Sequence, residues 1–76
     1  MKIYYILGND EIILFDLSYD QWLEIQSWCR ENLSSVHDSD YNDYGDKMDA
    51  WWVLKNPMDI SQFILRWSNG DIVTIP

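Results

Sequence analysis

The fold is decided by residues 3–33, IYYILGNDEIILFDLSYDQWLEIQSWCRENL. Within this stretch, two runs rich in β-branched and aromatic residues, 3–7 and 12–17, flank Gly-Asn-Asp-Glu at 8–11. Glycine, asparagine and aspartate tolerate the positive φ angles that tight turns need, so the pattern predicts a β-hairpin. Both runs are apolar on both faces, which is typical of a strand that is central or covered on both sides.

The rest of the stretch predicts an amphipathic helix over about residues 19–33, packed on the sheet. Ser18 and Gln21 mark its start with the spacing of a capping box, and Leu17 and Trp22 can form a hydrophobic staple across it. The apolar positions share one face of this helix: Tyr19, Trp22, Leu23, Ile25, Cys29 and Leu33.

Trp28 breaks the helical pattern, because it lies outside the apolar face, between Glu24 and Asn32. Either a second layer or a long loop covers this indole, or the indole is an exposed anchor for a partner, since Trp is the commonest hot-spot residue in interfaces. Both interpretations stay open, and Trp28 is kept as a candidate binding residue.

The C-terminal half is less regular. Residues 34–49 are the most polar stretch and predict a long loop, and loops of this length are often functional or mobile. Residues 50–54 predict a strand and residues 55–59 a turn.

Residues 60–76 fit two structures. Asn69-Gly70 between the apolar runs 63–67 and 72–75 is typical of a hairpin, whereas Asp59 and Gln62 have capping-box spacing before apolar positions at helical intervals. We choose the hairpin. The predicted order is then ββαβββ, a single α+β domain over residues 1–76 with one main helix on an antiparallel sheet.

The charge of the chain limits its partners. With 13 Asp and Glu against 5 Lys and Arg, the 76 residues carry a formal charge of −8. This argues against direct binding to DNA, RNA or an anionic membrane, which needs a positive face, and favours a protein partner with a basic surface. A single cysteine and an apolar N-terminal run too short for a signal peptide predict a cytoplasmic protein, in the host cytoplasm if phage-encoded.

The aspartates invite comparison with a calcium site. Asp38, Asp40, Asn42 and Asp49 match positions 1, 3, 5 and 12 of an EF-hand loop. However, Asp43 stands where that loop needs glycine, and Asp49 is one methylene shorter than the usual bidentate glutamate. We therefore expect no metal and no cofactor.

The sequence offers little for catalysis. The one cysteine, Cys29, lies on the buried face of the predicted helix, where a thiol is usually inert, and the one histidine, His37, follows the helix end. The chain contains no nucleophile elbow, P-loop or dinucleotide-binding fingerprint. We expect a protein that is not an enzyme.

A row of aspartates is the candidate surface for binding a partner protein. Aspartates recur at every third position from 40 to 49, with two tyrosines between them. Such a row can imitate a phosphate backbone and engage a partner's lysines and arginines, while the tyrosines give rigid contact area. The candidate partner-binding residues are Trp28, Asp38, Asp40, Tyr41, Asp43, Tyr44, Asp46 and Asp49.

Three functions follow as hypotheses. The first is an acidic protein-binding module, an inhibitor that occupies a basic, nucleic-acid-binding-type surface of another protein. Phage inhibitors of bacterial defence nucleases, and immunity proteins that block toxins, have this size and charge, which is an analogy of type only. The second is an adaptor domain that forms a homodimer through its aromatic surface. The third is a calcium-binding module.

Overall fold

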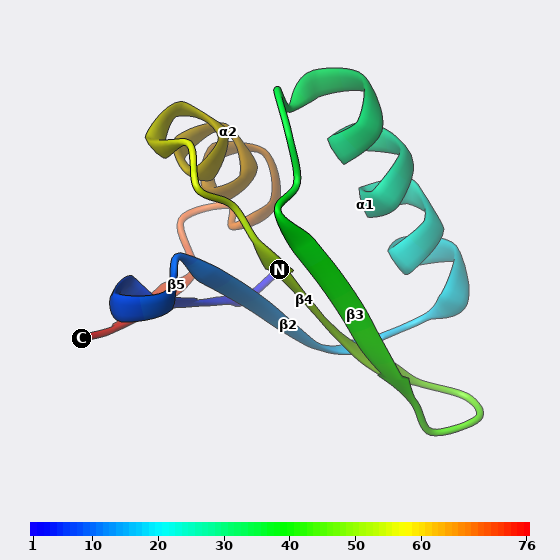
Figure 1. Ribbon diagram of the computed structural model, residues 1–76. Helices are drawn as coiled ribbons and strands as arrows, with labels where there is room; N and C mark the ends of the chain where they lie inside the picture. The colour runs from blue at the N-terminus through cyan, green and yellow to red at the C-terminus, as the bar shows by residue number, and fades with distance from the viewer.

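The computed structural model describes all 76 residues (Figure 1). Its elements in chain order are β1 (Ile3–Ile6), a 3₁₀ turn η1 (Leu7–Asn9), β2 (Glu11–Leu17), α1 (Tyr19–Asn32), β3 (Asp38–Asp43), β4 (Met48–Val53), α2 (Pro57–Trp67) and β5 (Ile72–Ile75). The predicted α+β class is confirmed, with both helices on the same side of one sheet. The order is ββαββαβ rather than ββαβββ.

The N-terminal hairpin and the first helix are confirmed. Strands β1 and β2 pair antiparallel around η1, and Asp10 closes the turn with a φ of 53°. Helix α1 begins with a complete capping box: the Gln21 backbone N–H donates to Ser18 Oγ at 3.1 Å, and the Ser18 N–H donates to Gln21 Oε1 at 2.9 Å. These two elements follow from local sequence signals alone.

The predicted C-terminal hairpin is wrong, because residues 57–67 form helix α2. Asn56 caps this helix by accepting from the Met58 N–H at 2.9 Å, and Pro57 takes the first helical position, where no N–H is needed. Asn69 and Gly70 have positive φ angles of 51° and 84°. Their conformation turns the chain after the helix instead of joining two strands.

The sheet is mixed rather than wholly antiparallel. Its strand order is β3-β4-β2-β1-β5, and all neighbours are antiparallel except β5, which runs parallel to β1. Helix α2 makes the parallel pairing possible, because it carries the chain from β4 across the sheet to the far side of β1, where β5 begins. Parallel strands need a long crossover connection of this kind.

The predicted loop at 34–49 contains a strand. Residues 38–43 pair with β4 from Asp38 opposite Val53 to Asp43 opposite Met48. This sequence has low β-propensity, so the strand owes its formation to backbone pairing with the apolar β4. Gly45, with a φ of 103°, lies in the turn, and the Tyr44 N–H donates to the Lys47 carbonyl at 2.8 Å.

The core lies between the sheet and the two helices. Trp52 of β4 is fully buried at its centre, where its Nε1 donates to Gln26 Oε1 of α1 at 2.7 Å. The ring of Phe63, from α2, lies 5.2 Å from the Trp52 ring. Trp52 therefore joins both helices to the sheet.

A buried carboxylate ties α2 to the segment after α1. Asp59 is only 4 % exposed, and it accepts hydrogen bonds from Ser34 Oγ at 2.6 Å, the Ser34 N–H at 3.0 Å and the Ser35 N–H at 3.2 Å. The Ser34 hydroxyl, helped by the two backbone donors and opposed by burial, lowers the pKa of Asp59. The charged form is thus the one that the fold stabilises.

We expect Asp59→Asn to lower the free energy of unfolding at pH 7 by about 1–3 kcal/mol, because it weakens charge-assisted hydrogen bonds in a buried place. The lowered pKa means that the stabilisation by Asp59 is present above its unfolded pKa of about 4 and is lost as pH falls through the folded pKa. Urea unfolding at pH 7, 5, 4 and 3 measures this. The difference between wild type and variant should shrink below about pH 4; a difference that stays constant would contradict this role for the charge.

Candidate protein-binding surface

Half of the sheet's side chains lie on the face opposite the helices, because side chains alternate along a strand. No helix covers this face. The pairing register places its side chains in cross-strand rows. One row is Asp40, Trp51, Ile13, Tyr4 and Val73, and the next is Asp38, Val53, Glu11, Ile6 and Ile75. We call these ten residues, together with Phe15, the open face.

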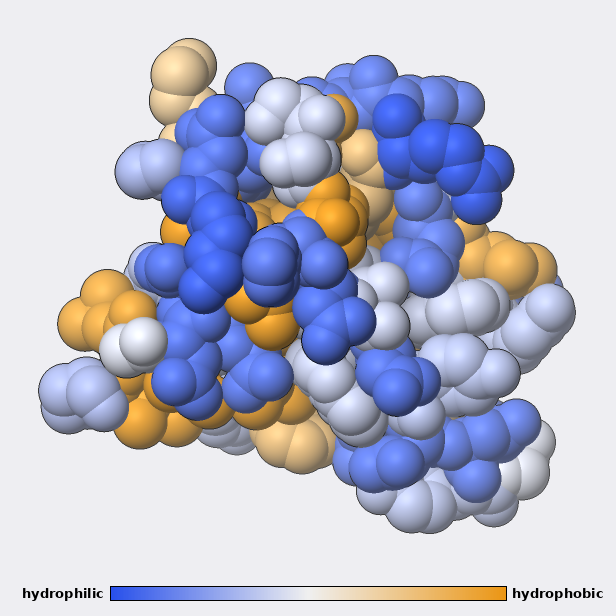
Figure 2. Space-filling view, viewed as in Figure 1, coloured by the Kyte–Doolittle hydropathy of each residue, from blue (hydrophilic) through white to orange (hydrophobic).

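The centre of the open face is aromatic and aliphatic. The Phe15 ring packs edge-on against the Tyr4 ring at 5.1 Å, and Phe15 remains 49 % exposed. Ile75, at the β5 edge, is 41 % exposed. Figure 2 shows apolar atoms gathered where β1, β2 and β5 meet, at the left, whereas the β3–β4 hairpin at the lower right is hydrophilic. Exposed apolar side chains that lie near one another on a sheet face are typical of a binding surface.

Carboxylates border this centre on the β3 side. Asp38 and Asp40 are exposed neighbours on the same face of the edge strand, so about 6.7 Å separates their positions. Glu11, directly across from Val53, and Asp49, across from Asn42, add two more carboxylates on this side of the sheet. The open face therefore combines an apolar centre with a negatively charged border.

The β3–β4 hairpin separates the predicted acidic residues. Tyr41 points to the helix side, where its ring lies 5.0 Å from that of Trp22. Asp43 shares that side and accepts from the Gly45 N–H at 2.9 Å. The prediction of one row with a period of three is therefore wrong, because a strand alternates with a period of two.

The other hairpin residues have local roles. Tyr44 Oη donates to Asp49 Oδ2 at 3.0 Å, and this hydrogen bond, with burial and the Asp49 charge as smaller causes, raises the pKa of Tyr44. Asp49 also accepts from the Asp16 N–H at 3.1 Å, which fixes the irregular end of β2. Asp46 is exposed in the turn. Asp49 thus holds the base of the hairpin to β2.

Trp28 lies on the helix side, away from the other candidate residues. Its ring makes edge-on contacts with Phe63 at 6.1 Å and Trp67 at 5.9 Å. Helix α2 therefore covers part of the indole, as a second layer would, and the half-buried remainder lines a groove between the two helices.

The one cysteine and the one histidine lie in different surroundings. Burial, with the Asp59 charge as a smaller cause, raises the pKa of Cys29 to about 12, so this thiol stays protonated near neutral pH. His37 is exposed at the start of the β3 segment. Nowhere do three or more His, Cys, Asp or Glu side chains lie close enough together to hold a metal ion.

The open face was not identified from the sequence, although its signal was present. The runs 3–7 and 12–17 are apolar on both faces, which predicts strands that are central or covered on both sides. Strands β1 and β2 are central in the sheet. Only one side is covered in the structure. The alternate positions Tyr4, Ile13 and Phe15 are therefore left facing outward.

Neither helix has the length and apolar character needed to cross a membrane. Comparison of the chain with protein-family models, with curated proteins and with solved structures finds no match.

Proposed function

We propose that the protein is a non-enzymatic binding module whose open face docks on a basic surface of another protein. The observation that carries this proposal is the pair of cross-strand rows, which set Trp51, Ile13 and Tyr4 beside the Asp40 carboxylate. A large apolar face rimmed by polar groups is typical of a protein interaction site. The same sheet buries its opposite face under two helices, so the open face is the side of the sheet that a partner can reach.

The charge supports a basic partner. The chain carries −8, and Asp38 and Asp40 are exposed at the border of the open face. Their separation of about 6.7 Å along the strand is close to that of neighbouring phosphates on one nucleic-acid strand, roughly 6–7 Å. A partner surface that binds nucleic acid could therefore bind Asp38 and Asp40 in place of two phosphates. The protein would then keep nucleic acid from that surface. An inhibitory role follows from this match.

Capture of the partner from a lysate of the cells that make the protein tests the proposal. We expect the double variant Asp38→Asn/Asp40→Asn to retain at least tenfold less partner than wild type at physiological salt. Exposed charges at the rim steer association and are screened over about 8 Å at that salt. Wild-type binding should also weaken as salt is raised.

The matched control is Glu31→Gln/Asp46→Asn, which changes the net charge by the same amount at exposed positions outside the open face. This variant should bind like wild type. Equal loss of binding in both variants would assign the effect to overall charge, and loss in neither would exclude the acidic border as a contact.

Self-association is a second candidate function, favoured by the apolar rows at the centre of the open face. Sedimentation between 5 and 500 µM would reveal it. Raised salt screens the repulsion between two acidic borders, so a homodimer should strengthen with salt while a complex with a basic partner weakens.

A further inference from the structure

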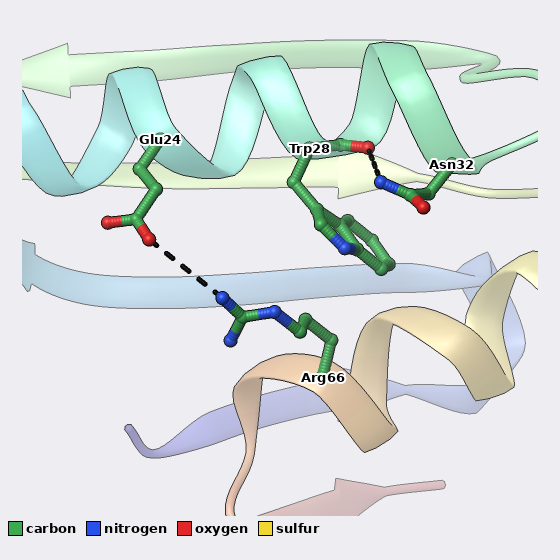
Figure 3. Close-up of polar contacts among 4 residues, drawn as sticks. All are labelled: Glu24, Trp28, Asn32 and Arg66. Atoms are coloured by element: carbon green, nitrogen blue, oxygen red, sulfur yellow. Dashed lines mark hydrogen bonds and ion pairs between the residues drawn. The ribbon is translucent and has the colours of Figure 1, made fainter.

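A groove of about 490 Å³ lies between the two helices, on the side of the molecule opposite the open face. Figure 3 shows α1 and α2 side by side in front of the strands, with the Trp28 indole pointing into the space between them. The groove is lined by Trp28 and Asn32 of α1 and by Gln62, Leu65 and Arg66 of α2.

Arg66 brings positive charge to this groove. Its guanidinium lies 4.1 Å from the centre of the Trp67 ring, which holds the group in place by a cation–π contact. Its ion pair with Glu24 is long, at 3.9 Å, and both side chains are about half exposed or more. Exposed pairs of this kind are weak, so a carboxylate ligand can compete with Glu24 for the guanidinium.

The walls of the groove are apolar and carry amide groups. Leu65 is 83 % exposed beside the half-buried Trp28, whose edge-on contacts with α2 fix its ring. Asn32 Nδ2 donates to the Trp28 carbonyl at 2.9 Å, which leaves the Asn32 carbonyl oxygen available as an acceptor. Gln62 supplies a second carboxamide.

We propose that this groove binds the C-terminal residue of a peptide with an apolar side chain. Charge complementarity selects the carboxylate, because Arg66 is the one charged side chain among the residues that line the groove. Trp28 and Leu65 would contact the side chain, and Asn32 would accept from the peptide N–H. The ligand thus has the opposite charge to the partner of the open face, and this proposal does not depend on that function.

The test uses three small probes in an NMR titration: N-acetyl-L-leucine, its neutral amide N-acetyl-L-leucinamide, and N-acetyl-L-aspartyl-L-leucinamide. We expect saturable shifts at the Trp28 indole N–H and at Gln62 and Leu65, with millimolar affinity for N-acetyl-L-leucine. This acid should bind at least fivefold tighter than its amide. Tightest binding of the aspartyl probe would overturn the assignment to a terminal carboxylate.

Three surface variants separate the contributions. Arg66→Gln should remove the preference for acid over amide, whereas Glu24→Gln should raise the affinity for the acid about threefold by freeing the guanidinium. Leu65→Ala should weaken acid and amide equally, since it removes apolar contact only. Because all three side chains are exposed, we expect the variants to fold like wild type, so that a change in affinity reflects the groove itself. Amide NMR spectra of each variant test whether the fold is intact.

The proposal is overturned if 20 mM N-acetyl-L-leucine leaves the Trp28, Gln62 and Leu65 signals unchanged. It is also overturned if acid and amide bind equally, or if the preference survives in Arg66→Gln.

Discussion

Replacing Trp51 with threonine is expected to weaken binding of the captured partner by about 100-fold while the domain remains folded. Trp51 lies on the central part of the open face, between Asp40 and Ile13 in its cross-strand row. An aromatic anchor at an interface centre contributes about 2–4 kcal/mol, and every 1.4 kcal/mol is tenfold in affinity. Threonine keeps the high β-propensity that the strand needs.

Titration calorimetry with the purified partner measures this loss, and thermal unfolding measures the stability of the variant. Leu65→Ala is the control, because Leu65 is highly exposed on the helix side and alanine suits a helix. This control should bind the partner of the open face like wild type. If Trp51→Thr keeps full affinity, Trp51 is not part of the interface.

Replacing the next residue, Trp52, with alanine is expected to remove about 3–5 kcal/mol of the free energy of unfolding. A domain of this length has a total of about 4–11 kcal/mol, so the Trp52→Ala protein should lose a large part of its stability and unfold at a markedly lower temperature. The substitution empties the centre of the core, where Trp52 contacts Phe63 and donates to Gln26. Urea unfolding followed by circular dichroism measures the effect.

The milder variant Trp52→Phe separates packing from hydrogen bonding. It keeps an aromatic ring against Phe63 but leaves Gln26 Oε1 without its donor. We expect a loss of about 1–3 kcal/mol with a cooperative transition. A Trp52→Ala protein that is as stable as wild type would contradict the central position of this residue. We thus expect substitutions of the adjacent tryptophans, which lie on opposite faces of the sheet, to impair binding in one case and folding in the other.

The parts of the fold that follow from the sequence are those with complete local signals. The capping box at Ser18 and the turn residues at 8–11 fix a helix and a hairpin through contacts within a few residues. By contrast, β3 forms because β4 is beside it, and no short-range pattern in residues 38–43 marks a strand. For residues 57–67 both patterns were present, and the Asn56 cap with Pro57 decided for a helix.

The candidate site was predictable only in part. Acidity and surplus aromatic residues are properties of composition, and they are a basis for proposing a protein-binding role without indicating a face. The face depends on pairing register, which brings Asp40 beside Trp51 and Asp38 beside Val53 although they are distant in sequence. Register is a tertiary property, so the sequence of the predicted loop does not show that Tyr41 and Asp43 lie on the helix side of the sheet.

Hydroxyl-radical footprinting of the protein alone and in complex with its captured partner tests the central claim most directly. The account predicts protection of Trp51, Tyr4 and Phe15 on the open face. It predicts unchanged oxidation of Tyr19 and Met58, which are 60 % and 70 % exposed on the two helices. Protection of Tyr19 and Met58, with Trp51, Tyr4 and Phe15 oxidised as in the free protein, would show that the partner binds the helices and would contradict the account.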